Sequence, residues 1–211
     1  MSFNIDQFSA EINSRGGLMR TNRFQLRIPP PPILLGRQGT QGMFTQESGT
    51  HFWAQDVQMP GYQLQSGNVR RYTYGPNETR PFAPNFQQVQ ANFAADGAMT
   101  IWQFFDAWLQ SIVPHDSDGI FAQQQSAFTG GRVYELSYKS EYATDIDIVL
   151  FNEIGDEVMK LTLYEAFPSN MNAIPLAWGE QNNYATFSVF FEYVDWNVEY
   201  FEQENFKRRT A

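Results

Sequence analysis

Two aspartates, Asp145 and Asp147, are the residues whose spacing first suggests chemistry in this chain. They lie two positions apart among apolar residues, so on a β-strand both carboxylates project from one face, opposite Ile146 and Ile148. Such a pair can bind a divalent metal or act in general acid–base catalysis. It lacks a histidine or a third carboxylate placed to complete a coordination sphere. We therefore prefer a solvated strand face to a metal or acid–base site.

Other candidates for chemistry are weaker. Asp116-Ser117-Asp118-Gly119 resembles the start of a calcium loop, but the third acidic position and the closing glutamate are missing. His51 and His115, the only histidines, have no serine or carboxylate motif beside them. The chain has no cysteine, which excludes thiolate nucleophiles and cysteine-based metal sites. We expect no catalytic, cofactor-binding or metal-binding residue and hence no enzyme.

The clearest helix is predicted over residues 96–113, with Pro114 as its stop. Its apolar face carries Trp102, Phe105 and Trp108, and aromatic side chains in such a row can stack on nucleic-acid bases. No lysine or arginine alternates with them, however, so contact with phosphates has no support. Core packing is the preferred interpretation of this face.

A short amphipathic helix is predicted near the N-terminus. Ile5, Phe8 and Ile12 recur at i, i+3 and i+7, and Gly16-Gly17 supplies a stop. A helix this short is marginal in isolation. We expect its apolar stripe to be buried against its own domain or, as our preferred interpretation, against a neighbouring subunit.

Alternation of apolar and polar residues predicts seven or eight strands, with prolines interrupting the pattern between residues 74 and 86. The predicted strands cover residues 24–28, 52–57, 69–74, 86–93, 133–138, 143–151, 158–164 and 184–194.

Two of these strands form a hairpin through a turn at residues 152–156. In its second strand Lys160 and Thr162 alternate with Leu161 and Leu163, as the aspartates alternate with isoleucines in the first strand. Because only one face of such a hairpin can be buried, the side that carries Asp145, Asp147, Lys160 and Thr162 is predicted to meet water.

The pattern as a whole predicts a mainly β fold, with two packed antiparallel sheets closed as a sandwich or barrel and one substantial flanking helix. One domain is expected, at residues 22–196, with loop insertions at about 29–50 and 114–132. Residues 1–21 form an N-terminal helix and arm, and residues 197–211 a polar C-terminal tail.

Composition limits the kind of partner. The 211 residues include 14 basic and 23 acidic ones, a formal net charge of −9 that argues against a surface for gripping nucleic-acid phosphates. A negative wall would instead suit a channel through which DNA slides without sticking. No signal peptide and no run of 18 apolar residues is present, so synthesis in the cytoplasm as a soluble protein is expected.

Several short signatures in fixed order carry a family resemblance. In order they are Asn22-Arg23-Phe24-Gln25-Leu26, Met59-Pro60-Gly61, the helix with Trp102, Phe105 and Trp108, then Phe167-Pro168-Ser169-Asn170, and last residues 186–196. In this order and spacing the chain resembles the tail tube proteins of contractile-tailed bacteriophages of the T4 type.

That resemblance implies a structural virion protein of the phage tail, assembled in the host cytoplasm. Its subunits would form homo-hexameric rings whose inner sheets join into a β-barrel, and the rings would stack into the tube for genome ejection. Sheath, tape-measure, baseplate and tail-terminator proteins would be its partners, and DNA would pass without specific binding. In this setting Asp145, Asp147, Lys160 and Thr162 are candidates to face the lumen, and Ile5, Phe8 and Ile12 to contact another subunit.

Two other roles stay open at this point. The N-terminal helix followed by the arginine and asparagine near residue 22 also resembles the baseplate tube-initiator proteins that start the tube. A ring protein of a related contractile injection or secretion system would have the same features.

Overall fold

The computed structural model describes residues 4–14, 17–35, 53–70, 75–113, 136–179 and 184–201. Several features of the sequence lie outside these residues. They are most of the predicted loop at 29–50, the loop at 114–132, both histidines, and the polar tail beyond residue 201.

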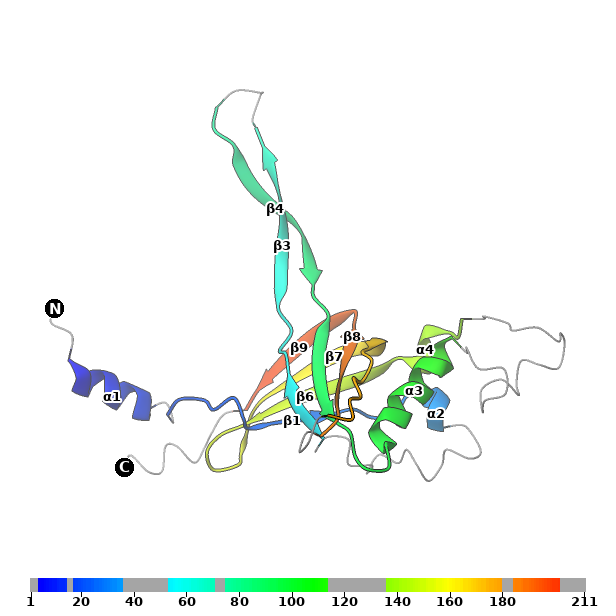
Figure 1. Cartoon of the computed structure of the whole chain (residues 1–211). Helices are drawn as coiled ribbons and strands as arrows, with labels where there is room; N and C mark the ends of the chain where they lie inside the picture. Colours follow the sequence, from blue (N-terminus) through cyan, green and yellow to red (C-terminus); the bar gives the residue numbers. More distant parts are fainter. Residues whose placement is uncertain are drawn as a thin grey trace, which may run out of the picture.

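The fold is mainly β, with two antiparallel sheets, as predicted. The first sheet contains β1 (Phe24–Arg27), β6 (Thr144–Phe151), the N-terminal half of β7 (Glu157–Met171) and β9 (Asp195–Tyr200). The second sheet contains the C-terminal half of β7, β8 (Thr186–Glu192), β5 (Val89–Ala94) and β2 (Ala54–Val57). Figure 1 shows these strands gathered into one body.

Strand β7 joins the two sheets by turning a corner. Its residues up to Tyr164 pair with β9, and those from Phe167 pair with β8. Between them Glu165 has a φ of +50°, an uncommon conformation for a residue with a side chain. The Asp145 carboxylate accepts a hydrogen bond from the Glu165 N–H at 3.0 Å, and Lys139 Nζ lies 2.6 Å from the Glu165 carboxylate. These contacts hold the corner in place.

A single apolar core lies between the sheets and helix α3 (Thr100–Ile112). The alternating residues of β5 and β8 bury Phe93 and Phe187, and the ring of Phe105 lies 4.9 Å from that of Phe93. Trp108 is fully buried and donates a hydrogen bond from Nε1 to the Tyr142 carbonyl at 2.8 Å. Of the predicted aromatic face, Phe105 and Trp108 are therefore core packing, whereas Trp102 is only partly buried.

The start of α3 lies a few residues later than predicted. The chain enters it through Met99, whose φ of +56° is left-handed and whose side chain makes no capping hydrogen bond. Asp96 supplies the cap instead, because its Oδ1 accepts the Ile101 N–H at 3.4 Å. Two short helices, α2 (Pro32–Leu35) and α4 (Lys139–Tyr142), add Leu34 and Tyr142 to the buried residues.

The strand pattern between residues 62 and 86 was predicted wrongly. Strands β3 (Tyr62–Val69) and β4 (Glu78–Phe86) form a long two-stranded hairpin there, although Pro81 and Pro84 suggested a break. Each strand of a two-stranded ribbon has one side without a neighbour in the described chain, and proline is tolerated on such a side. Figure 1 shows the hairpin standing away from both sheets.

Two other expectations change. Residues 136–138, the described part of the strand predicted at 133–138, are not a strand and lead into α4. Strand β9 was missed, and it extends the first sheet through Tyr200 into the segment expected to be a polar tail.

Candidate assembly surfaces

The hairpin of β6 and β7 has one dry and one wet face, as the sequence predicted. Ile146, Ile148, Leu161 and Leu163 are buried in the core. On the other side, Asp147 lies opposite Thr162 and accepts a hydrogen bond from its hydroxyl at 2.7 Å. Val149 is the exception to the alternation, since it lies on the wet side yet is fully buried between its cross-strand neighbours.

Cross-strand register extends this wet side over all four strands of the first sheet, and we call it the polar face. One row across the sheet runs Arg27, Asp147, Thr162, Asn197, and the next runs Gln25, Val149, Lys160, Glu199. Asp145 lies in the irregular register before Ile146, where it is exposed next to that buried residue and bonds the corner at Glu165. The structure therefore brings together all four residues predicted to share a face, namely Asp145, Asp147, Lys160 and Thr162.

The charges of the polar face are partly paired. Lys160 Nζ lies 3.2 Å from an Asp147 carboxylate oxygen, and Arg27 bonds the Glu157 carboxylate at 2.8 Å. Asp145 and Glu199 add negative charge, so acidic side chains outnumber basic ones on this face. The paired carboxylates are thus explained by ion pairs and hydrogen bonds within the sheet.

Helix α1 (Ile5–Ser14) forms where it was predicted, and Gly17, with a φ of +88°, bonds back to the Ile12 carbonyl at its end. Its apolar stripe faces solvent in the single chain. Ile5 is 71% exposed and Phe8 55%, while Ile12 is half-buried. Figure 1 shows α1 beyond the start of β1, away from the sheets.

The hairpin of β3 and β4 is amphipathic. Tyr62 lies opposite Phe86 and Leu64 opposite Pro84, which places these four side chains on one face. The next pairs along the ribbon, such as Gln63 with Asn85, put polar side chains on the other face. Tyr62 and Leu64 are 57% and 52% exposed. Sequence reasoning missed this surface, although the alternation of residues 62–65 carried the signal.

The base of the hairpin contacts the first sheet. The Tyr62 ring lies 6.4 Å from that of Trp196 on β9, and Phe86 lies 6.1 Å from Tyr193. The Tyr193 hydroxyl donates to the Gln87 carbonyl at 2.9 Å. Burial, followed by the negative charges of Glu192 and Asp195, raises the pKa of Tyr193, so this hydroxyl keeps its proton at neutral pH.

The sheets have open edges in the described part of the chain. On its side away from β6, the N-terminal half of β7 pairs with β9, and beyond β9 no strand follows. Strands β1 and β2 end the hydrogen-bonded order in the same way. An open edge is a row of unpaired backbone groups ready to bond another chain.

Nothing in the described segments forms a metal centre or a membrane span. No group of three or more histidine, aspartate or glutamate side chains among those residues is arranged to hold a metal ion. In the same part of the chain, no helix has the length and apolar content needed to cross a membrane.

Comparison with solved structures finds chains of similar fold. The tube-terminating cap of the anti-feeding prophage is similar at 12% identity and a TM-score of 0.52, over 87% of this chain and 91% of that one. A chain of an extracellular contractile injection system sheath–tube complex in the extended state is 13% identical, with a TM-score of 0.49 over 95% of this chain and 100% of that one.

Sequence comparison is more decisive. No curated protein matches the chain. A sequence profile described as phage tail tube protein matches residues 19–199, which cover both sheets, the hairpin and α3 but not α1. With two antiparallel sheets, one flanking helix and the ordered signatures in place, this chain belongs to the phage tail tube protein family.

Proposed function

We propose that this protein is a structural subunit that assembles into hexameric rings, and that the rings stack into the tail tube of a contractile phage tail. The observation that carries the proposal is the amphipathic hairpin of β3 and β4, whose apolar face is open to solvent in the single chain. A two-stranded hairpin is marginally stable alone. A neighbouring copy that covers this face would stabilise it.

Open sheet edges support the same proposal. The hairpin and the edge strand β9 have backbone groups available for pairing, and addition of strands from one copy to the edge of the next is a common mode of association. When the same contact repeats around an axis and closes, every subunit has its edges covered. Ring closure would therefore remove the aggregation hazard that the single chain presents.

The polar face of the first sheet is the proposed wall of the conduit. Apart from the buried Val149 its uncharged positions are hydrophilic, and its acidic side chains outnumber the basic ones. Phosphates would be repelled weakly and would find few cations to bind. Asp145, Asp147, Lys160 and Thr162 would then line the lumen through which the genome leaves, with no catalytic role for the carboxylates.

The wider setting follows from this role. As a virion component made in the host cytoplasm, the tube would bind sheath protein outside and tape-measure protein inside, and baseplate and tail-terminator proteins at its ends. The apolar stripe of α1, with Ile5, Phe8 and Ile12, would contact another subunit.

Electron microscopy of the purified protein tests the proposal. Stacked tubes with a central channel support a tube subunit, whereas rings that do not stack support a tube initiator. A chain that stays monomeric at every concentration would overturn the proposal.

A matched pair of variants tests the hairpin itself. Leu64→Asp places a charge on the apolar face, and Gln65→Asp places the same charge one residue on, where Gln65 pairs with Ala83 on the polar face. We expect Leu64→Asp to remain a folded monomer by light scattering and Gln65→Asp to assemble. Equal assembly of both variants would contradict the role given to the hairpin.

A further inference from the structure

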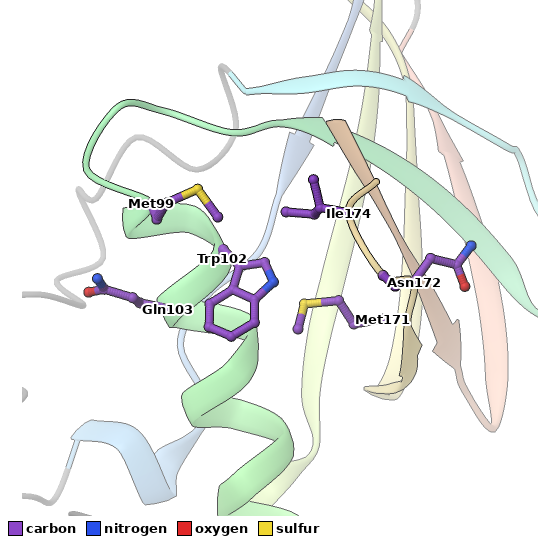
Figure 2. A pocket seen from close by; sticks show the side chains of 7 residues that line it. Met99, Trp102, Gln103, Met171, Asn172 and Ile174 are labelled. Carbon is purple, nitrogen blue, oxygen red and sulfur yellow. The ribbon is translucent and has the colours of Figure 1, made fainter. Parts of the chain in front are cut away.

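A cavity of about 550 Å³ lies between the start of α3 and the segment that follows β7. In Figure 2 the indole of Trp102 on α3 faces Met171 and Ile174 across the cavity, with Met99 at its upper end. Gln103, Asn172 and Ala173 complete the lining, which carries no charged side chain. The cavity is therefore an apolar site with two amides at its rim.

Exposed apolar side chains follow the cavity lining in the sequence. Residues 172–177 have no regular structure, and Leu176 two positions after Ile174 is 87% exposed. Trp178 is fully exposed. Large apolar side chains exposed this close in sequence to an apolar cavity favour a contact site over a solvated surface.

Helix α1 has the complementary shape and chemistry. Its anchors follow the i, i+3, i+7 spacing by which an amphipathic helix occupies an apolar groove. Ile5 and Ile12 are about 10 Å apart along the axis at 1.5 Å per residue. At 100° per residue, Asp6 points well away from this stripe and Glu11 lies at its margin, so an uncharged helix face meets an uncharged cavity.

No residue of α1 lines this cavity in its own chain. Figure 1 shows α1 and α3 at opposite sides of the body, with the strands of both sheets between them. A ten-residue helix is marginal without external packing, and Ile5 and Phe8 stay largely exposed in the single chain.

We propose that α1 of one subunit docks in this cavity of a neighbouring subunit, with Phe8 entering beside Trp102 and Ile174. The inference rests on the proposed self-assembly. It adds the site on the neighbouring subunit that binds the N-terminal helix. Since the matched family region begins at residue 19, this contact would be a feature added to the common tube fold.

Cross-linking tests the docking directly, because the chain has no native cysteine. One preparation carries Phe8→Cys and a second carries Ile174→Cys. They are mixed under assembly conditions and treated with a short bismaleimide. The control preparation replaces Phe8→Cys with Ala10→Cys, which lies on the opposite face of α1. Asn172→Cys, at an exposed rim position, is a second acceptor in case the half-buried Ile174 tolerates no change.

We expect a cross-linked dimer from Phe8→Cys with either acceptor, at least about fivefold more than from Ala10→Cys. Equal yields from Phe8→Cys and Ala10→Cys, or no dimer with either acceptor, would overturn the docking. So would an intramolecular link in a dilute chain that carries both Phe8→Cys and Asn172→Cys, because the helix would then occupy its own cavity. Microscopy of the same samples separates the two proposals, since rings without cross-links refute the docking and leave the tube function standing.

Discussion

Adjacent residues of β6 should respond to substitution in opposite ways, because the strand has one dry and one wet face. The change on the dry face is Ile148→Asp, and the change on the wet face is Asp147→Asn. Ile148 is fully buried and lies between Leu26 on β1 and Leu161 on β7 in the cross-strand register. Asp147 lies on the polar face beside Lys160 and Thr162.

The structure gives very different magnitudes for the two changes. Ile148→Asp removes a buried aliphatic side chain, which costs about 2–5 kcal/mol, and places a carboxyl in an apolar core at a further cost of several kcal/mol. The sum approaches the whole stability of a typical domain, about 5–15 kcal/mol. Asp147→Asn loses only an ion pair at the rim of the solvated face, whose side chains are 30% and 25% exposed, at a cost of about 1 kcal/mol, and the new amide oxygen can still accept the Thr162 hydrogen bond.

Urea denaturation followed by tryptophan fluorescence and far-ultraviolet circular dichroism measures both effects. We expect Ile148→Asp to be unfolded without denaturant. The free energy of unfolding of Asp147→Asn should lie within about 1 kcal/mol of that of the parent protein. The reasoning fails if Ile148→Asp stays folded with a loss under about 2 kcal/mol. It also fails if Asp147→Asn is as damaging as Ile148→Asp.

Three further predictions concern the core, the helix cap and the polar face. Trp108→Phe leaves the Tyr142 carbonyl without its donor, so we expect a loss of about 1–3 kcal/mol in the same urea assay. Burial opposes ionisation of Asp96, but hydrogen bonds from Thr100 and the backbone outweigh it and lower its pKa below 3.8. Asp96→Ala should therefore cost up to about 1 kcal/mol at neutral pH, and the difference should disappear as pH falls through that lowered pKa. In assembled tubes, Glu199→Cys should react with a small maleimide but not with a large polyethylene-glycol maleimide, whereas equal reaction with both would place the polar face outside.

The parts of the fold that were predicted are those whose pattern reflects burial within one chain. Residues 143–151 alternate because one side of β6 meets the core, and the positions of the buried isoleucines and leucines follow from that alternation. The hairpin of β3 and β4 was missed because both its strands lie mostly in solvent, and Pro81 and Pro84 resemble strand breakers. In the proposed assembly, its apolar face is covered by a neighbouring copy.

Among the candidate surfaces, too, some could be predicted from the sequence and others could not. The part of the polar face on β6 and β7 could be predicted because those two strands form one local hairpin. Strand β9 carries a readable alternation, with Trp196 and Val198 inward and Asn197 and Glu199 outward, but most of it lies in the segment predicted to be a polar tail. The cavity beside Trp102 could not be predicted, because it forms only where α3 meets a segment about 70 residues later in the chain.

The corner in β7 has a mechanical consequence. One uninterrupted backbone is hydrogen-bonded into the first sheet up to Tyr164 and into the second from Phe167. The two sheets therefore cannot slide past each other unless a ladder of backbone hydrogen bonds breaks at the same time. A force applied to one layer passes to the other through covalent bonds, with Asp145 and Lys139 bracing the bend at Glu165. A subunit built in this way deforms as one stiff unit under load, whichever surface receives the force.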